Sequence, residues 1–453
     1  MSEIKWIWLS DRCGVGSEDI LTLIFRMGNI DAIYGGDFDA YVSLGINERT
    51  AERLCDKDLD EAYQIMSWCE KNNVGVLGFD SKDFPTSLRA LKNPPVVLYY
   101  IGKLPDFNRE LFISVVGTRK MSEYGMKAAY KIAYEIAASG AVTVSGMALG
   151  IDGVTACASI AAGGRTVAVL GSGIDVIYPK EHTRLYEMIA EHGAVITEYP
   201  PATKPFGYNF PVRNRIISAL GAGTLVVDAP EGSGALITAK NAIIQGKDIY
   251  AVPGNIDGEN TWGTNALIRD GATAVLCGRD VVKDYAFLYR HSIDMHKLTE
   301  AESRSDFNPS ELLKMKIGMR VSTPVAQSIP NEKIEKKQSG SVGVEYNSFE
   351  SFKEQLSKEN KVKKESRKKS KKTIAPKAPE KQDMPSGDNS QKIIESLSQR
   401  QRDIFGEMPM DKPVTVDYFT KSGYGMGEVM SALTILEIKG LISSLPGALY
   451  IRK

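Results

Sequence analysis

The chain contains 453 residues, of which 43% are hydrophobic and 25% charged, and its 56 basic and 56 acidic side chains leave no net charge. This composition is typical of a globular protein, and the length predicts two to four domains of about 100–200 residues each. No apolar run reaches the roughly 20 residues of a membrane-spanning helix, and the N-terminus lacks the pattern of a secretion signal. Five scattered cysteines without a CxxC pair indicate reduced thiols, a cytoplasmic location and no metal site.

Residues 1–105 are predicted to form a mostly helical domain. Apolar residues recur at helical spacing over 20–25, with Ser17 as the expected N-cap, and a second helix is expected at 60–71. The sequence Gly14-Val15-Gly16 is similar to the turn of a helix-hairpin-helix motif. However, the region carries 11 basic and 16 acidic side chains, a net charge of −5, which favours a protein contact or a spacer over DNA binding.

Residues 106–290 alternate short Val- and Ile-rich runs with helical patterns. The runs are expected to be buried parallel strands, and they lie at 112–116, 141–144, 166–170, 194–197, 224–228, 248–252 and 272–276. The intervening helices are expected at 122–139, 153–162, 181–191, 213–220, 235–245 and 264–270. This alternation predicts an α/β fold with a doubly wound, parallel-rich sheet and right-handed crossovers.

The last third of the chain contains a predicted linker and a small domain. Residues 291–390 are rich in Lys, Ser, Glu and Pro and are expected to be disordered. Within them, 353–381 holds 12 basic and 4 acidic side chains, a net charge of +8, which suits either a solvated spacer or a loose grip on DNA. Residues 391–453 are expected to form a winged helix. Its candidate recognition helix, 427–439, carries too few cations to favour a grip on duplex DNA.

Glycine-containing loops follow several of the predicted strands. Gly117 and Arg119 follow the first strand, and in an open α/β sheet ligands bind at the carboxyl ends of the strands. Free N–H groups at a helix start favour an anion, and an arginine adds a bidentate phosphate donor. Alternatively, Gly117 only forms a tight turn and Arg119 is a surface residue. Similar loops contain Ser145-Gly146, Gly171-Ser172-Gly173 and Ser233-Gly234, and together they predict a phosphate-lined edge.

Residues 206–215 form the most specific segment, because they combine three aromatic residues with Arg213 and Arg215, shortly after Lys204. This combination suits single-stranded nucleic acid, whose bases stack while cations follow the backbone. The alternative is a packing loop whose arginines pair with carboxylates. The chain has no GxGxxG, no GxxxxGK and no GxSxG motif, so a nucleotide-driven enzyme or a serine hydrolase is poorly supported.

Seven motifs occur in a fixed order over residues 106–286. They are VVGTRKMSEYG, SGMALGIDGVTACASI, TVAVLGSGIDVIYPKEHTRL, FPVRNRIISAL, GSGALITA, YAVPG and GTNALIRDGA. In this order they resemble the DNA-processing protein A (DprA/Smf) family. The resemblance implies a non-enzymatic protein with an extended Rossmann-like domain, an N-terminal SAM-like helical domain and a C-terminal winged helix. It also implies binding of single-stranded DNA, a homodimer, and loading of a RecA-type recombinase in natural transformation, with no cofactor. A single-strand-binding protein is a further candidate partner.

The resemblance also assigns individual residues. Arg119 and Lys180 match positions that contact DNA in the family, and Arg213, Asn214 and Arg215 match its basic loop, with Lys204 close by. The pocket-lining loops correspond to Gly117, Ser145, Gly146, Gly171, Gly173, Ser233 and Gly234. The segment 263–271 matches the region of the dimer contacts, so Asn265, Leu267 and Ile268 are candidate interface residues.

The chain departs from the family pattern at three positions. Ala156 stands where a histidine is usual, His182 where asparagine is common, and Gly207 where a relative carries a DNA-contacting lysine. An enzymatic alternative is a nucleotide phosphoribohydrolase of the lysine-decarboxylase-like family, which has a similar sheet and a PGGxGTxxE loop. Thr238 replaces the glutamate of that loop, so the general acid/base is missing.

Overall fold

The computed structural model describes residues 2–303, 399–409, 414–415, 418–419, 433, 436, 441–445 and 449–452. The chain divides into two compact units, residues 1–369 and 370–453. The predicted disorder between 304 and 390, and with it the basic segment 353–381, lies outside the described residues. Among the described helices, none combines the length and the apolar character that crossing a membrane requires.

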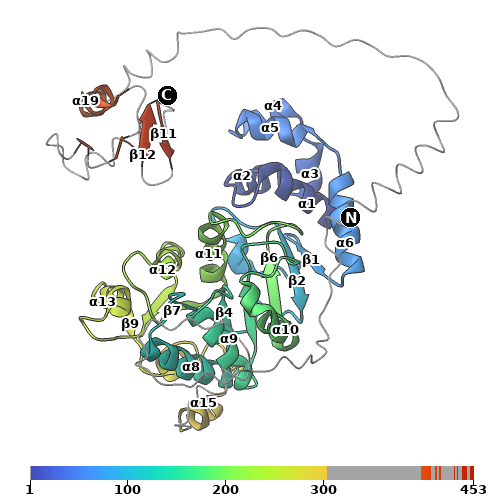
Figure 1. Cartoon of the computed structure of the whole chain (residues 1–453). Helices are drawn as coiled ribbons and strands as arrows, with labels where there is room; N and C mark the ends of the chain where they lie inside the picture. The colour runs from blue at the N-terminus through green and yellow to red at the C-terminus, as the bar shows by residue number, and fades with distance from the viewer. Residues whose placement is uncertain are drawn as a thin grey trace, which may run out of the picture. The chain divides into compact units, whose positions relative to one another are not determined.

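The first unit begins with a helical region, drawn in dark blue in Figure 1. It consists of α1 (Ser2–Cys13), α2 (Asp19–Met27), α3 (Ile30–Gly35), α4 (Phe38–Ser43), α5 (Glu48–Cys55) and α6 (Asp60–Lys71). The side chains of Asn29, Asp37 and Asn47 accept N–H groups at the starts of α3, α4 and α5, which satisfies donors that a helix start leaves unpaired. The helices expected at 60–71 and over 20–25 are confirmed.

The helical region ends at Lys71, and the boundary expected at residue 105 is therefore too late. Strands β1 (Gly75–Gly78) and β2 (Val97–Gly102), with the short helix α7 (Thr86–Arg89) between them, belong to the sheet. β2 pairs antiparallel with β6 (Gly193–Thr197), and β1 pairs antiparallel with β2. The reason is burial: Val97, Leu98 and Tyr99 are apolar on both faces of the strand and pack into the core of the sheet.

The centre of this unit is a sheet of nine described strands in the order β1-β2-β6-β5-β4-β3-β7-β8-β9. The remaining strands are β3 (Phe112–Val116), β4 (Val142–Ser145), β5 (Thr166–Val169), β7 (Gly223–Val226), β8 (Asp248–Ala251) and β9 (Thr273–Ala274). From β6 to β9 every neighbouring pair is parallel. The predicted parallel-rich α/β class is confirmed, and the strands lie within a few residues of their expected bounds.

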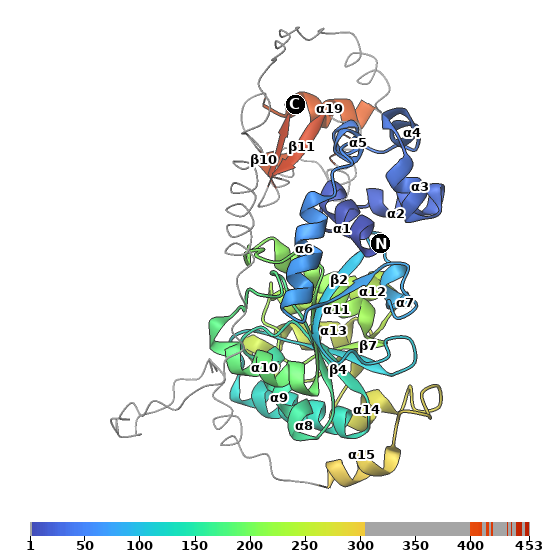
Figure 2. The same cartoon turned by 90° about the vertical axis from the view of Figure 1, so that its right-hand side faces the viewer.

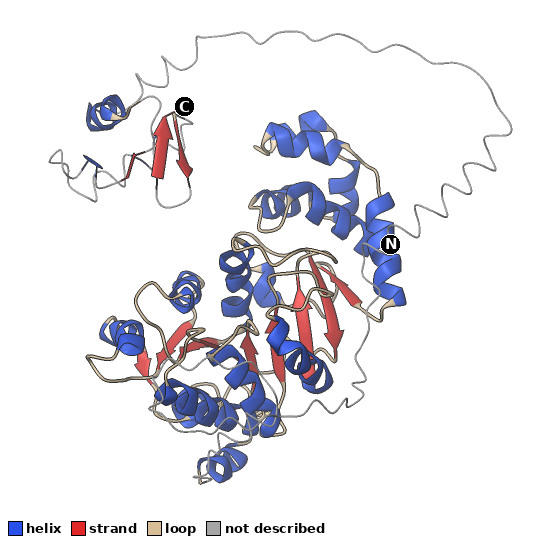
Figure 3. Cartoon of the chain, in the orientation of Figure 1, coloured by secondary structure: helices blue, strands red, loops and turns tan. Residues whose placement is uncertain are grey.

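Helices cover both faces of the sheet (Figure 3). One layer contains α8 (Glu123–Ala138), α9 (Ile151–Ala161) and α10 (Thr183–His192), which follows the 3-10 turn η1 (Lys180–His182). The other contains α7, α11 (Asn209–Leu220) and α12 (Gly234–Ile244), while η2 (Glu259–Thr261) and α13 (Trp262–Arg269) lie beside β8. The chain order reverses between β3 and β7. In a doubly wound sheet the loops after two such strands diverge and leave a crevice between them.

Residues 291–303 are ordered, although the sequence predicted disorder from 291 onward. α14 (Gly278–Val282) and α15 (Met295–Glu302) pack against α8, and both can be followed in the rotated view of Figure 2. Leu298 and Ala301 of α15 are buried, and the Asp294 side chain caps its first turn. The sequence did not reveal this helix, because two buried residues and one capping residue are a weak signal within a segment of mostly polar composition.

The second unit contains α19 (Gln399–Glu407), β10 (Val414–Thr415), β11 (Ile442–Leu445) and β12 (Leu449–Arg452). β12 lies between β10 and β11 and pairs antiparallel with both. Leu433 and Leu436 are helical and buried in the core of this unit. The rest of the candidate recognition helix, 427–439, lies outside the described residues.

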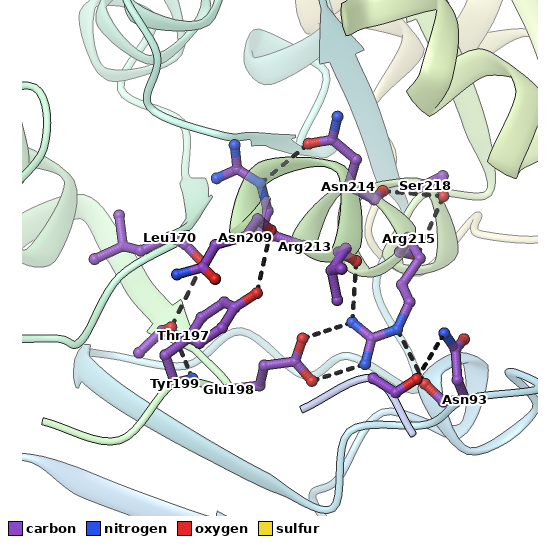
Figure 4. Close-up of polar contacts among 12 residues, drawn as sticks. Asn93, Leu170, Thr197, Glu198, Tyr199, Asn209, Arg213, Asn214, Arg215 and Ser218 are labelled. Carbon is purple, nitrogen blue, oxygen red and sulfur yellow. Dashed lines mark hydrogen bonds and ion pairs between the residues drawn. The ribbon is translucent and has the colours of Figure 1, made fainter. Parts of the chain in front are cut away.

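A buried ion pair fixes α11 against the sheet (Figure 4). Arg215 is 5% exposed, and its Nη1 and Nη2 donate to Oε1 and Oε2 of Glu198 at 2.6 and 2.7 Å. Its Nε donates to the carbonyl oxygen of Asn93 at 3.0 Å. Glu198 directly follows β6, so this one guanidinium joins α11, the end of β6 and the segment before β2.

Replacing Arg215 with Met is expected to lower the free energy of unfolding by about 3–5 kcal/mol, because Glu198 is left buried without a partner. The double variant Arg215→Met/Glu198→Met should recover most of this loss. Urea denaturation measures both values. The matched control is Arg184→Met, which removes the exposed pair with Glu187 and should cost no more than about 1 kcal/mol. Equal losses for Arg215→Met and Arg184→Met would show that the buried pair does not anchor α11.

Candidate nucleic-acid interface

A groove of about 760 Å³ opens at the carboxyl ends of β3 and β7, at the crevice where the strand order reverses. The loop after β3, residues 116–120, forms one wall, and the loop after β7, residues 230–234, forms the other. The start of α11, from Phe210 to Asn214, and the first residues of α12 complete the lining. The groove is therefore built by loops that the parallel sheet gathers at one edge.

Arg119 is the cation best placed to meet a ligand in the groove. Its side chain is exposed, and its guanidinium carbon lies 5.1 Å from the ring centroid of Phe210. Tyr178 lies on the same ring, with centroids 5.6 Å apart. Within the described part of the chain, Arg119 makes no ion pair with a carboxylate. A guanidinium placed over an aromatic ring and open to solvent can contact a phosphate and a base at once.

Lys180, in the 3-10 turn η1, and Lys204, in the loop before α11, are exposed and lie beside the groove, although neither is among its lining residues. Lys180 opens η1, directly after Pro179, which lines a small recess next to Arg119. Lys204 immediately precedes Pro205, a lining residue of the groove itself. Both are placed to follow a polyanion that enters or leaves the groove.

Arg213 lines the groove, but its side chain is only 4% exposed and its guanidinium holds parts of the fold together. Its Nη1 donates to the carbonyl oxygens of Gly146, at 3.1 Å, and Val169, and its Nε donates to Asn214 at 3.1 Å. Burial lowers the pKa of Arg213 to about 10, while the nearby Asp152 opposes this shift. Arg213 therefore joins α11 to the ends of β4 and β5.

The structure does not bring Arg215 to the groove. It is on the same helix as Arg213, but its guanidinium is occupied by Glu198 and Asn93 on another side of α11 (Figure 4). Both arginines of the segment 206–215 thus use their guanidinium groups within the protein. For Arg215 the alternative interpretation of the segment, in which an arginine pairs with a carboxylate, is the one that the structure shows. Asn214 is half-buried and does line the groove.

Two of the helix starts at this edge already carry a carboxylate of the chain itself. Asp152 accepts the N–H of Gly146 at 2.9 Å, in the loop before α9. Asp228 accepts the N–H of Ser122 at 2.7 Å and its hydroxyl at 2.9 Å, at the start of α8. Burial raises the pKa of both aspartates. Some of the backbone N–H groups that the sequence analysis assigned to a ligand phosphate are therefore already bound by carboxylates of the protein.

The start of α12 differs, because its first turn has no acidic residue. Ser233 accepts the N–H of Ala235 at 3.3 Å, and both Ser233 and Gly234 line the groove. This helix start faces Arg119 across the opening and leaves N–H groups for an anion. Of the predicted phosphate-binding edge, two parts therefore remain available to a ligand: the loop after β3 on one wall of the groove and the start of α12 on the other.

The other predicted pocket glycines make room for the protein's own side chains. A Cβ on Gly146 would lie 2.5 Å from Nη2 of Arg213, and one on Gly171 would lie 2.9 Å from the ring of Phe210. Gly173 packs in the same way against the backbone at 200–203. Ser145 is fully buried, and the groove lining includes neither it nor Gly146, Gly171 and Gly173. Gly117 does line the groove, and it packs closely against Ile151.

The departures from the family pattern have clear positions. His182 is buried, its Nδ1 lies 3.0 Å from the carbonyl oxygen of Met147, and its ring covers Gly153 in the first turn of α9. Ala156 lies one turn further along the same helix and is fully buried. The chain thus places an imidazole from η1 against α9. Gly207 lies at the edge of the groove, where an added Cβ would meet open space.

Asp228 and Asn260 connect the Arg119 loop to η2, the 3-10 turn that directly precedes α13. The Asn260 side-chain amide donates to the carbonyl oxygen of Lys120 at 3.0 Å and to Asp228 at 3.2 Å. The backbone N–H of Thr118 donates to the Asp228 carbonyl oxygen at 2.6 Å. Sequence reasoning missed both residues. The only sequence signal was an aspartate as the last residue of a predicted buried strand, 224–228.

One group of side chains in the described residues has the spacing of a metal site: Glu135, Cys277 and Glu302. The two carboxylates of this group already accept hydrogen bonds from the protein. Glu135 accepts the N–H of Gly278 at 2.5 Å, and Glu302 accepts two nitrogens of Arg279. This group lies on α8, α14 and α15, away from the groove lining.

Comparisons with known proteins identify a family for the chain. Residues 75–286 match the family model described as DNA recombination-mediator protein A. The DNA processing protein DprA of Bacillus subtilis is 38% identical over 221 residues, which is 49% of this chain and 74% of that protein. Protein Smf of Escherichia coli is 33% identical over 302 residues, which is 63% of this chain and 79% of that protein. The X-ray structure of DprA from Streptococcus pneumoniae superposes with a TM-score of 0.56 at 31% identity, covering 62% of this chain and 97% of that one. The chain belongs to the DNA-processing protein A (DprA/Smf) family of recombination mediators.

Proposed function

We propose that the groove binds single-stranded DNA and that the protein then helps to load a RecA-type recombinase onto that DNA, during DNA uptake and homologous recombination. The observation that carries the proposal is Arg119, an exposed arginine over the Phe210 ring at the mouth of the groove. Stacking on an aromatic ring suits unpaired bases, and a nearby cation suits the backbone. The recombinase, and a single-strand-binding protein as a further partner, rest on membership of a recombination-mediator family.

The proposed role is non-enzymatic. Thr238, at the position of the glutamate in the phosphoribohydrolases, is buried in α12. The exposed Glu231 lines the same wall of the groove, but it lies in the loop before α12 and not at the position of that glutamate. Asp152 lines the groove but is held by two backbone N–H groups. Release of ribose phosphate from nucleoside monophosphates by the purified protein would support the enzymatic alternative. A cytoplasmic location is part of the proposal and is consistent with five free cysteines.

A homodimer through the β9 edge is also part of the proposal. Leu267 and Ile268 are half-buried on α13, while Trp262 on the same helix and Leu276 after β9 are exposed. Asn265 has a different role within the chain, because its side chain exchanges hydrogen bonds with the backbone of Gly254. An exposed apolar surface beside an edge strand favours contact with a second copy of the chain.

Charge reversal at Arg119 and Lys180 (Arg119→Glu/Lys180→Glu) is expected to abolish binding of single-stranded DNA, because both cations face the proposed path of the backbone. Gel shift with a labelled oligonucleotide measures the effect. Single neutral variants should reduce the slope of log affinity against log salt by about 0.7 for each phosphate that is no longer neutralised. The matched control is Lys127→Glu on the exposed face of α8. Unchanged affinity of the double variant would disprove the site.

Asp228→Ala is expected to weaken DNA binding by about tenfold, equivalent to about 1.4 kcal/mol, although Arg119 itself is unchanged. The substitution removes the acceptor for Ser122 and Asn260 and so releases the loop that carries Arg119. Stability should fall by about 1–3 kcal/mol through the unpaired donors. Asp257→Ala, in the exposed part of the neighbouring segment, is the control. If Asp228→Ala lowers stability but leaves the affinity of the folded protein intact, Asp228 has no positioning role.

Ile268→Arg is expected to convert a dimer into a monomer, because a charge would be buried in the apolar contact. Light scattering should give twice the 49.6 kDa chain mass for the unaltered protein and the single mass for the variant. Phe25→Arg, at an exposed residue of α2, serves as the control and should leave the mass unchanged. A dimer that persists in Ile268→Arg would place the contact elsewhere.

A further inference from the structure

Two aromatic side chains lie on the surface just outside the groove. Phe206 is 47% exposed and Tyr208 is 69% exposed. Their rings are stacked, with centroids 5.4 Å apart and planes 8° from parallel. Neither ring belongs to a hydrophobic cluster of the described residues. The pair therefore exposes flat apolar faces to water without contributing to the core.

The turn that carries the two rings is held by hydrogen bonds at both ends. Asn209 donates its side-chain amide to the carbonyl oxygens of Gly171, at 2.9 Å, and Lys204, at 3.2 Å. The N–H of Asn209 donates to Phe206 at 3.0 Å, and the N–H of Gly173 donates to Thr203 at 2.9 Å. These bonds fix the turn to the loop after β5. A planar ligand would thus find both rings already in position, with little ordering of side chains to overcome.

The turn is continuous with the groove. Pro205 and Gly207 are lining residues, and Gly207 lies between the two stacked rings in the sequence. A Cβ at Gly207 would meet nothing within 4 Å, so no other part of the described chain crowds the backbone between the two rings. Phe210, the third aromatic residue of the segment, lies inside the groove with Arg119 and Tyr178. The aromatic residues therefore form two separate sites.

We propose that the Phe206–Tyr208 pair is a second nucleobase-stacking site, which receives a base of the strand after it leaves the groove. This inference rests on the proposed function, because it extends the path of the same strand. Bases of any kind have a flat π face, so the site would add affinity without sequence preference. The exposed Lys204, two residues before Phe206, is placed to meet the adjacent phosphate. An apolar protein side chain is the competing occupant, and the test separates the two.

The experiment uses the full chain and oligothymidylates that carry 2-aminopurine at successive single positions, since the fluorescence of this base changes when it stacks. In the unaltered protein, at least two separated positions should respond, one for each aromatic site. Phe206→Ala/Tyr208→Ala should remove the response of one position and weaken binding about tenfold, within the range for removal of one stacked base. The salt dependence should not change, because the substitutions remove no cation.

Two further variants make the result specific. Phe206→Leu/Tyr208→Leu keeps an apolar surface but removes the flat rings, so it should bind as weakly as the alanine variant. Tyr63→Ala, at an exposed tyrosine of α6, is the matched control. Leucine variants that bind as tightly as the unaltered protein would overturn base stacking in favour of a general apolar contact. Alanine variants that bind normally would overturn the site altogether.

The outcome also distinguishes this inference from the function on which it rests. If the unaltered protein binds no oligonucleotide, the proposed function fails. If it binds, and charge reversal at Arg119 and Lys180 abolishes binding while the alanine double variant retains full affinity, only the second stacking site fails. Because both rings are exposed, the melting temperature should be the same for all of these aromatic variants.

Discussion

The proposed interface depends on the hydrogen bonds that the buried guanidinium of Arg213 makes to the ends of two strands. This group donates to the carbonyl oxygens that end β4 and β5, and it lies beside the carboxylate of Asp152. The guanidinium is almost fully buried, so these acceptors, together with Oδ1 of Asn214, set its position. Because Arg213 is near the start of α11, fixing it also fixes Phe210 and the turn at 204–209. The aromatic residues and the strand ends are therefore parts of one rigid arrangement.

The groove shows how a near-neutral domain can still hold a polyanion. Residues 106–290 contain 17 basic and 18 acidic side chains, a net charge of −1. Asp152 and Asp228 are buried, and they neutralise helix starts rather than repel a ligand from the surface. What remains open is local: Arg119 on one wall and the start of α12 on the other. Net charge therefore says little about this function, since a local cluster of donors is sufficient.

The same arrangement explains why the site differs from a nucleotide-binding Rossmann fold. There the first helix start takes the pyrophosphate of a dinucleotide. Here the corresponding start, that of α8, is occupied by Asp228. Asp228 also holds Asn260, so the anion position has become a connection between the Arg119 loop and the edge of the sheet at α13. A ligand is left with the outer part of the crevice, which is lined by Arg119 and by the start of α12.

The class of fold, the strands from 112 onward and the edge of the sheet that carries the loops can all be predicted from the amino-acid sequence. These features follow from local patterns: apolar runs, helical periodicity and glycines after strands. The order of the motifs in the sequence also identifies the family. Which of the cations are exposed, in contrast, depends on how the chain packs in three dimensions. Arg119, Arg213 and Arg215 look alike in sequence, yet one is exposed, one holds strand ends and one is paired with Glu198. The position of β1 and β2 in the sheet also depends on packing, because β2 pairs with β6, a strand far along the chain. Burial and pairing between distant segments are set by packing, and no local pattern records them.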